Sequence, residues 1–232
     1  MGKSIQHVFF DLDRTLWDFE SNSEATLKEL FSEFDLSSKL GVSDLSFIHE
    51  YKRINEIFWE DYRNGTIEKH YLRYGRFETA LKFFGHDDKE LASEIGELYI
   101  SRSPRKTNLI DGSIEVLEYL KPHYELHIIT NGFEEVQQIK MESSGLSPYF
   151  KEIITSESAG AKKPSRIIFE RAEKLTGAAP SNSIMIGDHF EADVVGAIES
   201  KWKAVLFEPE KPRITDEGYI HIHHLKELMG IL

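Results

Sequence analysis

The chain contains no cysteine. This absence excludes disulfides, thiolate nucleophiles and cysteine-ligated zinc or iron–sulfur centres, and it agrees with a reducing compartment. Long apolar runs are also missing, because no segment approaches the roughly 20 residues of a membrane span and the N-terminal run is too short for a signal peptide. We therefore predict a cytoplasmic protein that does not bind or cross a membrane.

Positive charge is scarce as well. The chain has 28 Lys and Arg against 40 Asp and Glu, which gives a formal net charge of −12. Such an excess repels nucleic-acid backbones and anionic membrane surfaces, so we expect neither as a partner. What is present is 40% hydrophobic residues in a chain of 232, enough for one large domain or for a domain with a smaller insertion.

Strand and helix patterns alternate over much of the chain. Short apolar segments rich in branched residues predict strands at 7–10, 125–130, 151–155, 183–187 and 203–207. Helical patterns lie between the last four, at 133–144, 164–176 and 191–200. This alternation predicts an α/β fold with a parallel sheet and right-handed crossovers. The tail, 219–232, indicates a further short strand and a closing helix.

The first strand interrupts this rhythm. Roughly ninety residues without a convincing strand separate it from the second, far more than an ordinary connection. Apolar residues at helical spacing predict four helices in this stretch, with apolar stripes such as Tyr74, Phe77, Leu81 and Phe84 on the third. We therefore predict a catalytic core of residues 1–16 and 107–232 and an inserted helical cap of residues 17–106.

Two aspartates, Asp11 and Asp13, directly follow the first predicted strand. On an extended strand, residues two apart point to the same side, so the carboxylates are expected to converge. Like charges so close are costly unless a cation or a proton lies between them, and oxygen ligands favour Mg²⁺. Taken alone, such a pair is more often a turn or a cap.

Other polar residues follow the next three strands. Thr130 and Asn131 precede a helix and could form an anion pocket, although an ordinary helix cap fits them equally. Lys163, before Pro164 at a predicted helix start, could hold a phosphate or offset a carboxylate. The next strand is followed by acidic residues, Asp188 and Asp193. Because the carboxyl ends of parallel strands share one edge, all of these groups are expected to meet there.

Four segments resemble the motifs of the haloacid dehalogenase superfamily, in the same order: "FFDLDRTL", "IITNG", "KKP" and "IGDHFEAD". A helical insertion after the first motif resembles the C1 cap of that superfamily. More narrowly, "FWEDYRNGTI", "YGRFETAL" and "TNGFEEVQQIKMESSGLSPYF" resemble the pyrimidine 5'-nucleotidase branch. The resemblance implies a Rossmann-like core with a four-helix C1 cap.

The resemblance also implies a phosphatase mechanism. Asp11 would attack phosphorus to form an aspartyl-phosphate, and Asp13 would protonate the leaving oxygen and then activate water. The phosphoryl oxygens would be held by Thr130, Asn131 and Lys163. The ligands of Mg²⁺ would be Asp11, the backbone carbonyl of Asp13, Asp188 and Asp193. A metal-bound carboxylate is a poor proton donor, so Asp13 must keep its side chain off the metal.

The expected substrate is a small phosphate monoester, in the first place a pyrimidine nucleoside 5'-monophosphate, and the expected oligomeric state is a monomer or a homodimer. In the predicted cap, Trp59 could stack on a base, and Arg73 and Arg76, three apart and off the apolar stripe, could contact substrate. Solvated surface and packing are the competing interpretations.

Other functions remain open at this point. Sugar-phosphate phosphatases, phosphoglycolate phosphatases and phosphomutases of the same superfamily share the core residues. A signalling receiver domain also uses a phospho-accepting aspartate, but that aspartate follows its third strand, whereas Asp11 follows the first. A non-catalytic binding protein on this scaffold is a further alternative, although every catalytic role has a candidate residue.

Overall fold

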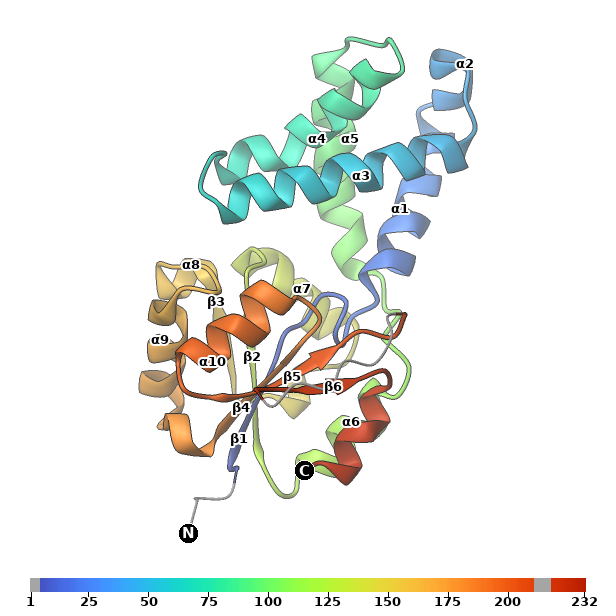
Figure 1. Cartoon of the computed structure of the whole chain (residues 1–232). Coiled ribbons are helices and arrows are strands. Elements are labelled where there is room, and N and C mark those ends of the chain that lie inside the picture. Colours follow the sequence, from blue (N-terminus) through green and yellow to red (C-terminus); the bar gives the residue numbers. More distant parts are fainter. Residues whose placement is uncertain (1–4, 211–217) are drawn as a thin grey trace. The chain divides into compact units, whose positions relative to one another are not determined.

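The computed structural model describes residues 5–210 and 218–232. The chain forms two compact units: Met1–Phe19 with Thr107–Leu232, which we call the core unit, and Glu20–Lys106, which we call the helical unit. Figure 1 labels their elements. Within the described ranges, no helix combines the length and the apolar character that a membrane crossing requires.

The core unit is built on a six-stranded parallel sheet with the order β3-β2-β1-β4-β5-β6. Its strands are β1 (His7–Phe10), β2 (Glu125–Thr130), β3 (Glu152–Thr155), β4 (Ser183–Gly187), β5 (Lys203–Phe207) and β6 (Ile220–Ile222). This confirms the predicted Rossmann-like α/β fold. Because β1 pairs with β2 on one side and with β4 on the other, the strand order reverses at β1, where such folds bind their ligands.

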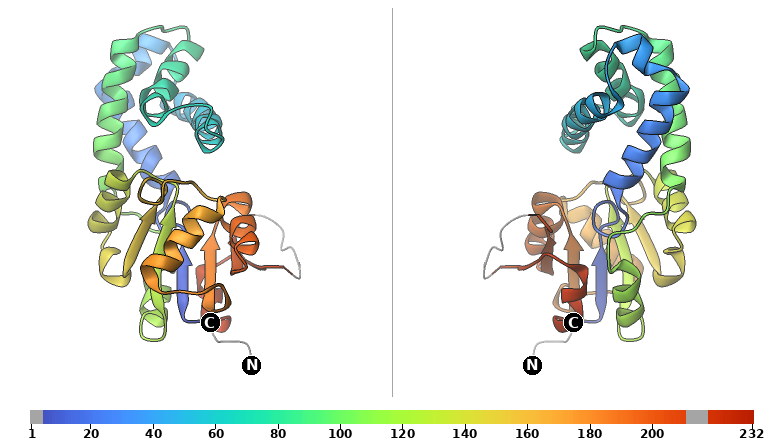
Figure 2. Two further views of the ribbon diagram at one scale, coloured as in Figure 1. Left: turned by 90° about the vertical axis from the view of Figure 1, so that its left-hand side faces the viewer. Right: turned by 90° about the vertical axis from the view of Figure 1, so that its right-hand side faces the viewer.

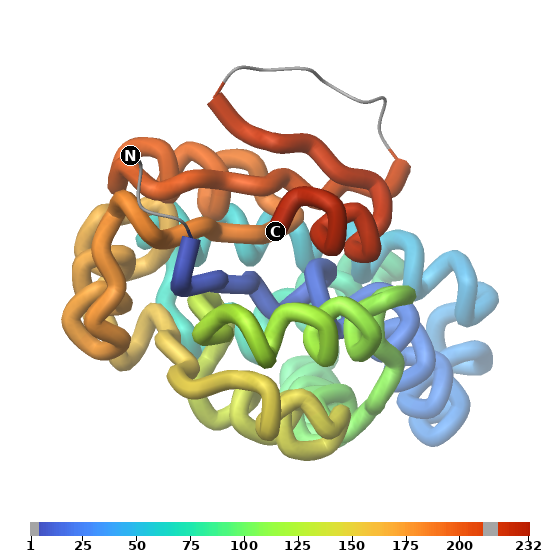
Figure 3. The backbone as a smooth tube through the Cα atoms, turned by 90° about the horizontal axis from the view of Figure 1, so that it is seen from below, coloured from blue at the N-terminus to red at the C-terminus, as the bar shows by residue number. Residues whose placement is uncertain are grey.

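Helices flank the sheet on both faces (Figures 2 and 3). They are α6 (Ser113–Leu120), α7 (Glu134–Ser143), α8 (Ser156–Ala159), α9 (Arg166–Thr176), the π-helical η4 (Phe190–Val195) and α10 (Gly196–Glu199), with shorter 3-10 turns at η2 (Ser147–Tyr149), η3 (Pro180–Asn182) and η5 (Leu225–Gly230). Alternation along β1 serves both faces, since Val8 and Phe10 pack with α6 and η5 while Phe9 packs with α9 and α10.

In the core unit one local prediction is wrong, and another is confirmed with a change of helix type. Pro164 is not the first helical residue, because α9 begins at Arg166 and the Ser165 hydroxyl accepts a hydrogen bond from the Ile167 N–H as its cap. The helix expected at 191–200 is a π-helical turn followed by the short α10. An extra residue in a π turn changes the direction of the side chains around Asp193, and hydrophobic periodicity does not show it.

The helical unit contains α1 (Phe19–Glu33, whose first residue belongs to the core unit), α2 (Leu36–Leu40), α3 (Asp44–Arg63), α4 (Lys69–Phe83), α5 (Lys89–Arg102) and the 3-10 turn η1 (Ser103–Arg105). The four long helices correspond to the four that periodicity predicts, and α2 is an addition. The prediction that Arg76 lies off the apolar stripe is wrong, because Arg76 is buried with Phe77, Ala80 and Leu81 on the inner face of α4.

Candidate active site

The centre of the candidate site is an ion cluster around Lys163. Its ammonium donates to Asp11 Oδ1 at 2.6 Å, to Asp193 Oδ1 at 2.5 Å and to the Ile129 carbonyl at 2.8 Å. The residue is only 2% exposed. An ammonium has three N–H donors, and all three are used here. The sequence left two functions open for Lys163, holding a phosphate or offsetting a carboxylate. The structure shows the contact with carboxylates that the second function requires.

Asp11 is held by the strands on which the site is built. It directly follows β1, and its backbone N–H donates to the Ile186 carbonyl of β4 at 2.8 Å. Its carboxylate therefore lies at the point where the strand order reverses. Burial raises the pKa of Asp11 well above its ordinary value; Lys163 opposes the shift, and Asp193 and Asp188 add to it.

Asp193 is fixed from both sides of its carboxylate. Oδ1 accepts from Lys163, and Oδ2 accepts from the His189 N–H at 3.0 Å. The close approach depends on a glycine, because a Cβ on Gly187 would lie 2.1 Å from Asp193 Oδ2. The last residue of β4 must therefore lack a side chain for this carboxylate to lie where it does.

Asp188 completes the acidic group. The Thr15 hydroxyl donates to Asp188 Oδ1 at 3.3 Å. Burial and the neighbouring Asp193 raise the pKa of Asp188 to about 7, although Arg14 acts in the opposite direction. Lys163 thus contacts Asp11 and Asp193, and Asp188 adds a third carboxylate to their electrostatic environment, which leaves an excess of negative charge. Carboxylate oxygens in such a group suit a hard divalent cation such as Mg²⁺.

Asp13 has a separate set of partners. Lys140 donates to its Oδ1 at 2.6 Å, and Gln137 donates to its Oδ2 at 2.9 Å. The Lys140 ammonium also lies 4.4 Å from the centre of the Trp17 ring. The strand alternation that predicted convergence of the two aspartates does not extend to Asp13, because β1 ends at Phe10. The two carboxylates therefore occupy different environments.

The "TNG" segment ties these two environments together. Gln137 also donates to the Thr130 hydroxyl at 2.8 Å, so one amide bridges Thr130 and Asp13. Asn131 pairs with the backbone of Lys163: its Oδ1 accepts the N–H at 2.7 Å and its Nδ2 donates to the carbonyl at 3.0 Å. The Asn131 side chain thus holds the loop that carries Lys163.

Sequence reasoning missed four residues of this arrangement: Arg14, Thr15, Gln137 and Lys140. Gln137 and Lys140 lie three apart on α7 and share a helix face, and both are buried. Polar residues at this spacing are typical of a solvated face, so periodicity points away from their true position. The only clue in the sequence was the position of these two residues, one and two turns into the helix that follows Thr130.

The candidate substrate residues of the helical unit differ in their surroundings. Arg76 is 5% exposed and donates to Asn55 Oδ1 at 2.7 Å. Arg73 and Trp59 are half-buried, and the Trp59 ring meets the Tyr62 ring edge-on with centroids 5.7 Å apart. Arg76 is therefore an interior residue of the helical unit, whereas Arg73 and Trp59 keep part of their surface exposed.

A doubly wound parallel sheet with carboxylates and a lysine at the carboxyl ends of its strands has the architecture of a Rossmann-like hydrolase core. The chain belongs to the haloacid dehalogenase-like hydrolase family, whose model matches residues 8–207. This confirms the family that the four motifs predicted.

The chain is similar to several known members. It is 31% identical to pyrimidine 5'-nucleotidase YjjG of Escherichia coli, over 83% of this chain and 81% of that protein. It is 30% identical to ribulose-1,5-bisphosphate 5-phosphatase of Halopiger xanaduensis, over 88% of this chain and 85% of that protein. The magnesium-bound crystal structure of the HAD-hydrolase YfnB of Bacillus subtilis superposes with a TM-score of 0.88 at 26% identity, covering 99% of both chains.

Proposed function

We propose that the protein is a Mg²⁺-dependent phosphomonoesterase that prefers pyrimidine nucleoside 5'-monophosphates. The observation that carries this proposal is the separation of Asp11 from Asp13. Asp11 is buried with Asp193 and Lys163 beside the half-buried Asp188, while Asp13 is half-buried and bound to Lys140 and Gln137. Carboxylates kept in different environments can serve as nucleophile and as acid in one reaction.

The proposed reaction has two steps. An Asp11 carboxylate oxygen attacks phosphorus, the bond to the ester oxygen breaks, and Asp13 gives a proton to that leaving oxygen. Asp13 then takes a proton from water, whose oxygen attacks the aspartyl-phosphate and releases inorganic phosphate and Asp11. Displacement of a halide needs no such proton, so an acid at Asp13 favours phosphate esters over haloacids.

The residues present fit a magnesium ion, because Asp11, Asp188 and Asp193 gather more negative charge than Lys163 offsets. Asp11, Asp188 and the backbone carbonyl of Asp13 would hold it. Both Asp193 oxygens already accept hydrogen bonds, so we assign Asp193 to holding Lys163 and to contact with the ion through water. When bound, the ion supplies positive charge to the phosphoryl oxygens.

We assign phosphate binding to Thr130 and Lys163, with Asn131 positioning the latter. The supporting contacts are the Asn131 side chain on the Lys163 backbone and the Lys163 ammonium on Asp11 Oδ1. An ammonium already next to the nucleophile needs little movement to meet an incoming phosphate, and its charge opposes the repulsion between two anions.

We further propose that the helical unit is the cap that sets substrate preference. Trp59 and Arg73 are its candidate contacts, because both keep exposed surface and offer a ring for stacking and a guanidinium for an anion. Arg76 does not enter this proposal, since it is buried against Asn55. A cap of this kind excludes water when it closes over a substrate.

A phosphate-release assay tests the function. UMP, dUMP and dTMP are compared with ribulose and hexose phosphates, and 2-haloacids are tested in parallel for halide release, each with Mg²⁺ and with EDTA. We expect Mg²⁺-dependent release from the pyrimidine nucleotides, and loss of that release in Asp11→Asn with an unchanged circular dichroism spectrum. A preference for sugar phosphates would show that pyrimidine nucleotides are the wrong substrate class. The substrate would then resemble that of the ribulose-1,5-bisphosphate 5-phosphatase relative. Turnover by Asp11→Asn would contradict the assignment of Asp11 as the nucleophile.

A further inference from the structure

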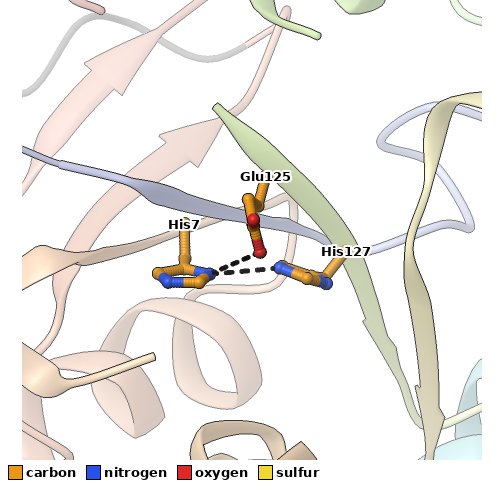
Figure 4. Close-up of side chains that lie close together, drawn as sticks. All are labelled: His7, Glu125 and His127. Atoms are coloured by element: carbon orange, nitrogen blue, oxygen red, sulfur yellow. Dashed lines mark hydrogen bonds and ion pairs between the residues drawn. The ribbon is translucent and has the colours of Figure 1, made fainter. Parts of the chain in front are cut away.

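Three metal-ligating side chains meet at the amino-terminal edge of the sheet, the edge opposite the candidate active site. His7 is the first residue of β1, Glu125 is the first residue of β2, and His127 follows two residues later. The parallel register pairs His7 with Glu125 and Phe9 with His127, so the three side chains lie on one face of two adjacent strands. Figure 4 shows them pointing toward one another.

The distances within this group match those of a metal centre. His7 Nδ1 lies 3.3 Å from His127 Nε2 and 3.7 Å from Glu125 Oε2, and one ligand atom from each residue lies within 4.8 Å of the others. Ligand atoms at about 2.0–2.1 Å from a tetrahedral Zn²⁺ are about 3.3 Å apart. The two imidazoles thus already have the spacing that a shared ion requires.

Hydrogen bonding alone satisfies this group poorly. One N–H can lie between His7 Nδ1 and His127 Nε2, and the Glu125 carboxylate faces the same point as a further acceptor. A cation at the common point would satisfy all three acceptors at once.

The surroundings keep the ligands in place. The His127 ring stacks on Phe9 with centroids 4.8 Å apart, and both histidines are buried. Lys151 donates to Glu125 Oε1 at 2.6 Å, which leaves Oε2 as the atom that faces His7. Burial and the neighbouring His7 lower the pKa of His127 to about 4, so this imidazole is neutral at pH 7 and able to bind a metal.

We propose that His7, Glu125 and His127 bind one divalent transition-metal ion of the zinc class. Two imidazole nitrogens and one carboxylate favour Zn²⁺, Co²⁺ or Ni²⁺ over Mg²⁺, so this site and the proposed magnesium site take different ions. The described residues supply three ligands, and water would complete a tetrahedron. Because the ion joins the first residues of β1 and β2, it stabilises the folded sheet by binding the native state.

Titration of the full chain with Co²⁺ in saturating Mg²⁺ tests the proposal, since bound Co²⁺ has a visible absorption spectrum that reports its ligands. We expect one Co²⁺ per chain, displaced by Zn²⁺, and a rise in melting temperature with Zn²⁺. His7→Asn and Glu125→Gln should each weaken binding by at least about 10-fold, because even partners of metal ligands are worth that much. Glu125 is half-exposed, so Glu125→Gln is expected to fold even if the histidine variants do not.

Two further variants act as controls. His123→Asn removes an exposed imidazole two residues before Glu125 and should leave binding unchanged. Lys151→Met removes the ammonium that orients Glu125 through Oε1 and should weaken binding by less than Glu125→Gln does. The proposal is overturned if folded wild-type protein takes up no Co²⁺ with Mg²⁺ present, or if folded Glu125→Gln binds Co²⁺ as tightly as the wild type does.

Discussion

The two units each bury a cation, and the two cations have different neighbours. Lys163 of the core unit contacts the carboxylates of Asp11 and Asp193. Arg76 of the helical unit donates to the neutral amide of Asn55, and its guanidinium lies 5.2 Å from the centre of the Tyr99 ring. Both are about equally hidden from solvent, at 2% and 5% exposed.

We interpret the difference as that between the proposed active site and a packing site. Burial alone lowers the pKa of Lys163, but Asp11 and Asp193 outweigh burial and raise the pKa above its ordinary value, so the ammonium stays charged. It belongs to a group with surplus negative charge, at which we propose that a further cation binds. The described contacts of Arg76 are with neutral groups, which hold helices together and offer nothing to a phosphate ester. Burial of a charged side chain therefore does not by itself indicate a functional site. The groups that it contacts must also be considered.

Replacing the first cation should produce the largest effect. In Lys163→Met we expect phosphate release to fall by about 10²- to 10³-fold, because one preorganised charge next to the reacting group is typically worth that much. The matched control is Lys162→Met, which changes the adjacent half-buried lysine and should cost less than about 10-fold. Steady-state assays with dUMP at saturating Mg²⁺ measure both. Equal losses of phosphate release in the two variants would show that Lys163 has no special role in the reaction.

Replacing the second cation should affect stability. Arg76→Met leaves the buried Asn55 amide without its donor, which is expected to cost about 1–3 kcal/mol in the free energy of unfolding. Lys28→Met removes an exposed lysine that pairs with Glu24 in the same unit and should cost less than about 1 kcal/mol. Urea denaturation measures both variants. An Arg76→Met protein as stable as the wild type would show that this cation is not a packing element.

Two adjacent glutamines on α7 extend the comparison to Asp13. Gln137 is buried and contacts Asp13 and Thr130, whereas Gln138 is exposed and contacts Glu142. Loss of a hydrogen bond to a carboxylate costs about 1.5–3 kcal/mol, so Gln137→Ala should lower kcat about 10-fold or more and alter its pH profile. Gln138→Ala should leave both unchanged. A pH profile of Gln137→Ala that coincides with the wild type would argue against a positioning role.

The smallest expected effect concerns the surplus negative charge. Burial and Asp193 raise the pKa of Asp188 from 3.8 to about 7, so the folded state binds more protons than the unfolded state between these values. In EDTA, the free energy of unfolding should therefore fall as pH rises from about 4 to about 7. The Asp188→Asn substitution removes this loss of stability. The variant should therefore melt at least about 2 °C higher than the wild type at pH 8.

Melting curves in EDTA at pH 5 and pH 8 make this test. With Mg²⁺ the order of the two proteins at pH 8 should reverse, because the ion favours the ionised carboxylates of the wild type. A lower melting temperature for Asp188→Asn in EDTA at pH 8 would show that Asp188 does not carry unfavourable charge in the fold.

Much of the core unit could be predicted from local patterns. Short branched apolar segments placed the strands, and Asp11, Thr130 and Asp188 lie at or just after the carboxyl ends of β1, β2 and β4. Side-chain direction could not be predicted. Asp13 lies beyond the end of its strand, and Arg76 occupies the inner face of α4, because long-range packing decided which face of that helix is buried.

The pairing of lysines with aspartates illustrates the same limit. "KKP" pointed to Lys163 but not to its partners, and in "VQQIK" nothing local distinguishes Gln137, which contacts Asp13, from Gln138. The contacts of Lys163 with Asp11 and Asp193 span 152 and 30 residues of chain. The group formed by His7, Glu125 and His127 escaped notice for this reason, since its members join only when β1 pairs with β2.

The sequence by itself determined the class of fold, the family and the edge of the sheet at which polar residues gather, because strand periodicity and motif order are properties of neighbouring residues. The tertiary structure decided which carboxylates share Lys163, which side chains hold Asp13 and where two histidines and a glutamate meet. Those contacts depend on strand order, on the π turn before α10 and on the small space beside Gly187, and such features exist only once distant segments have packed together.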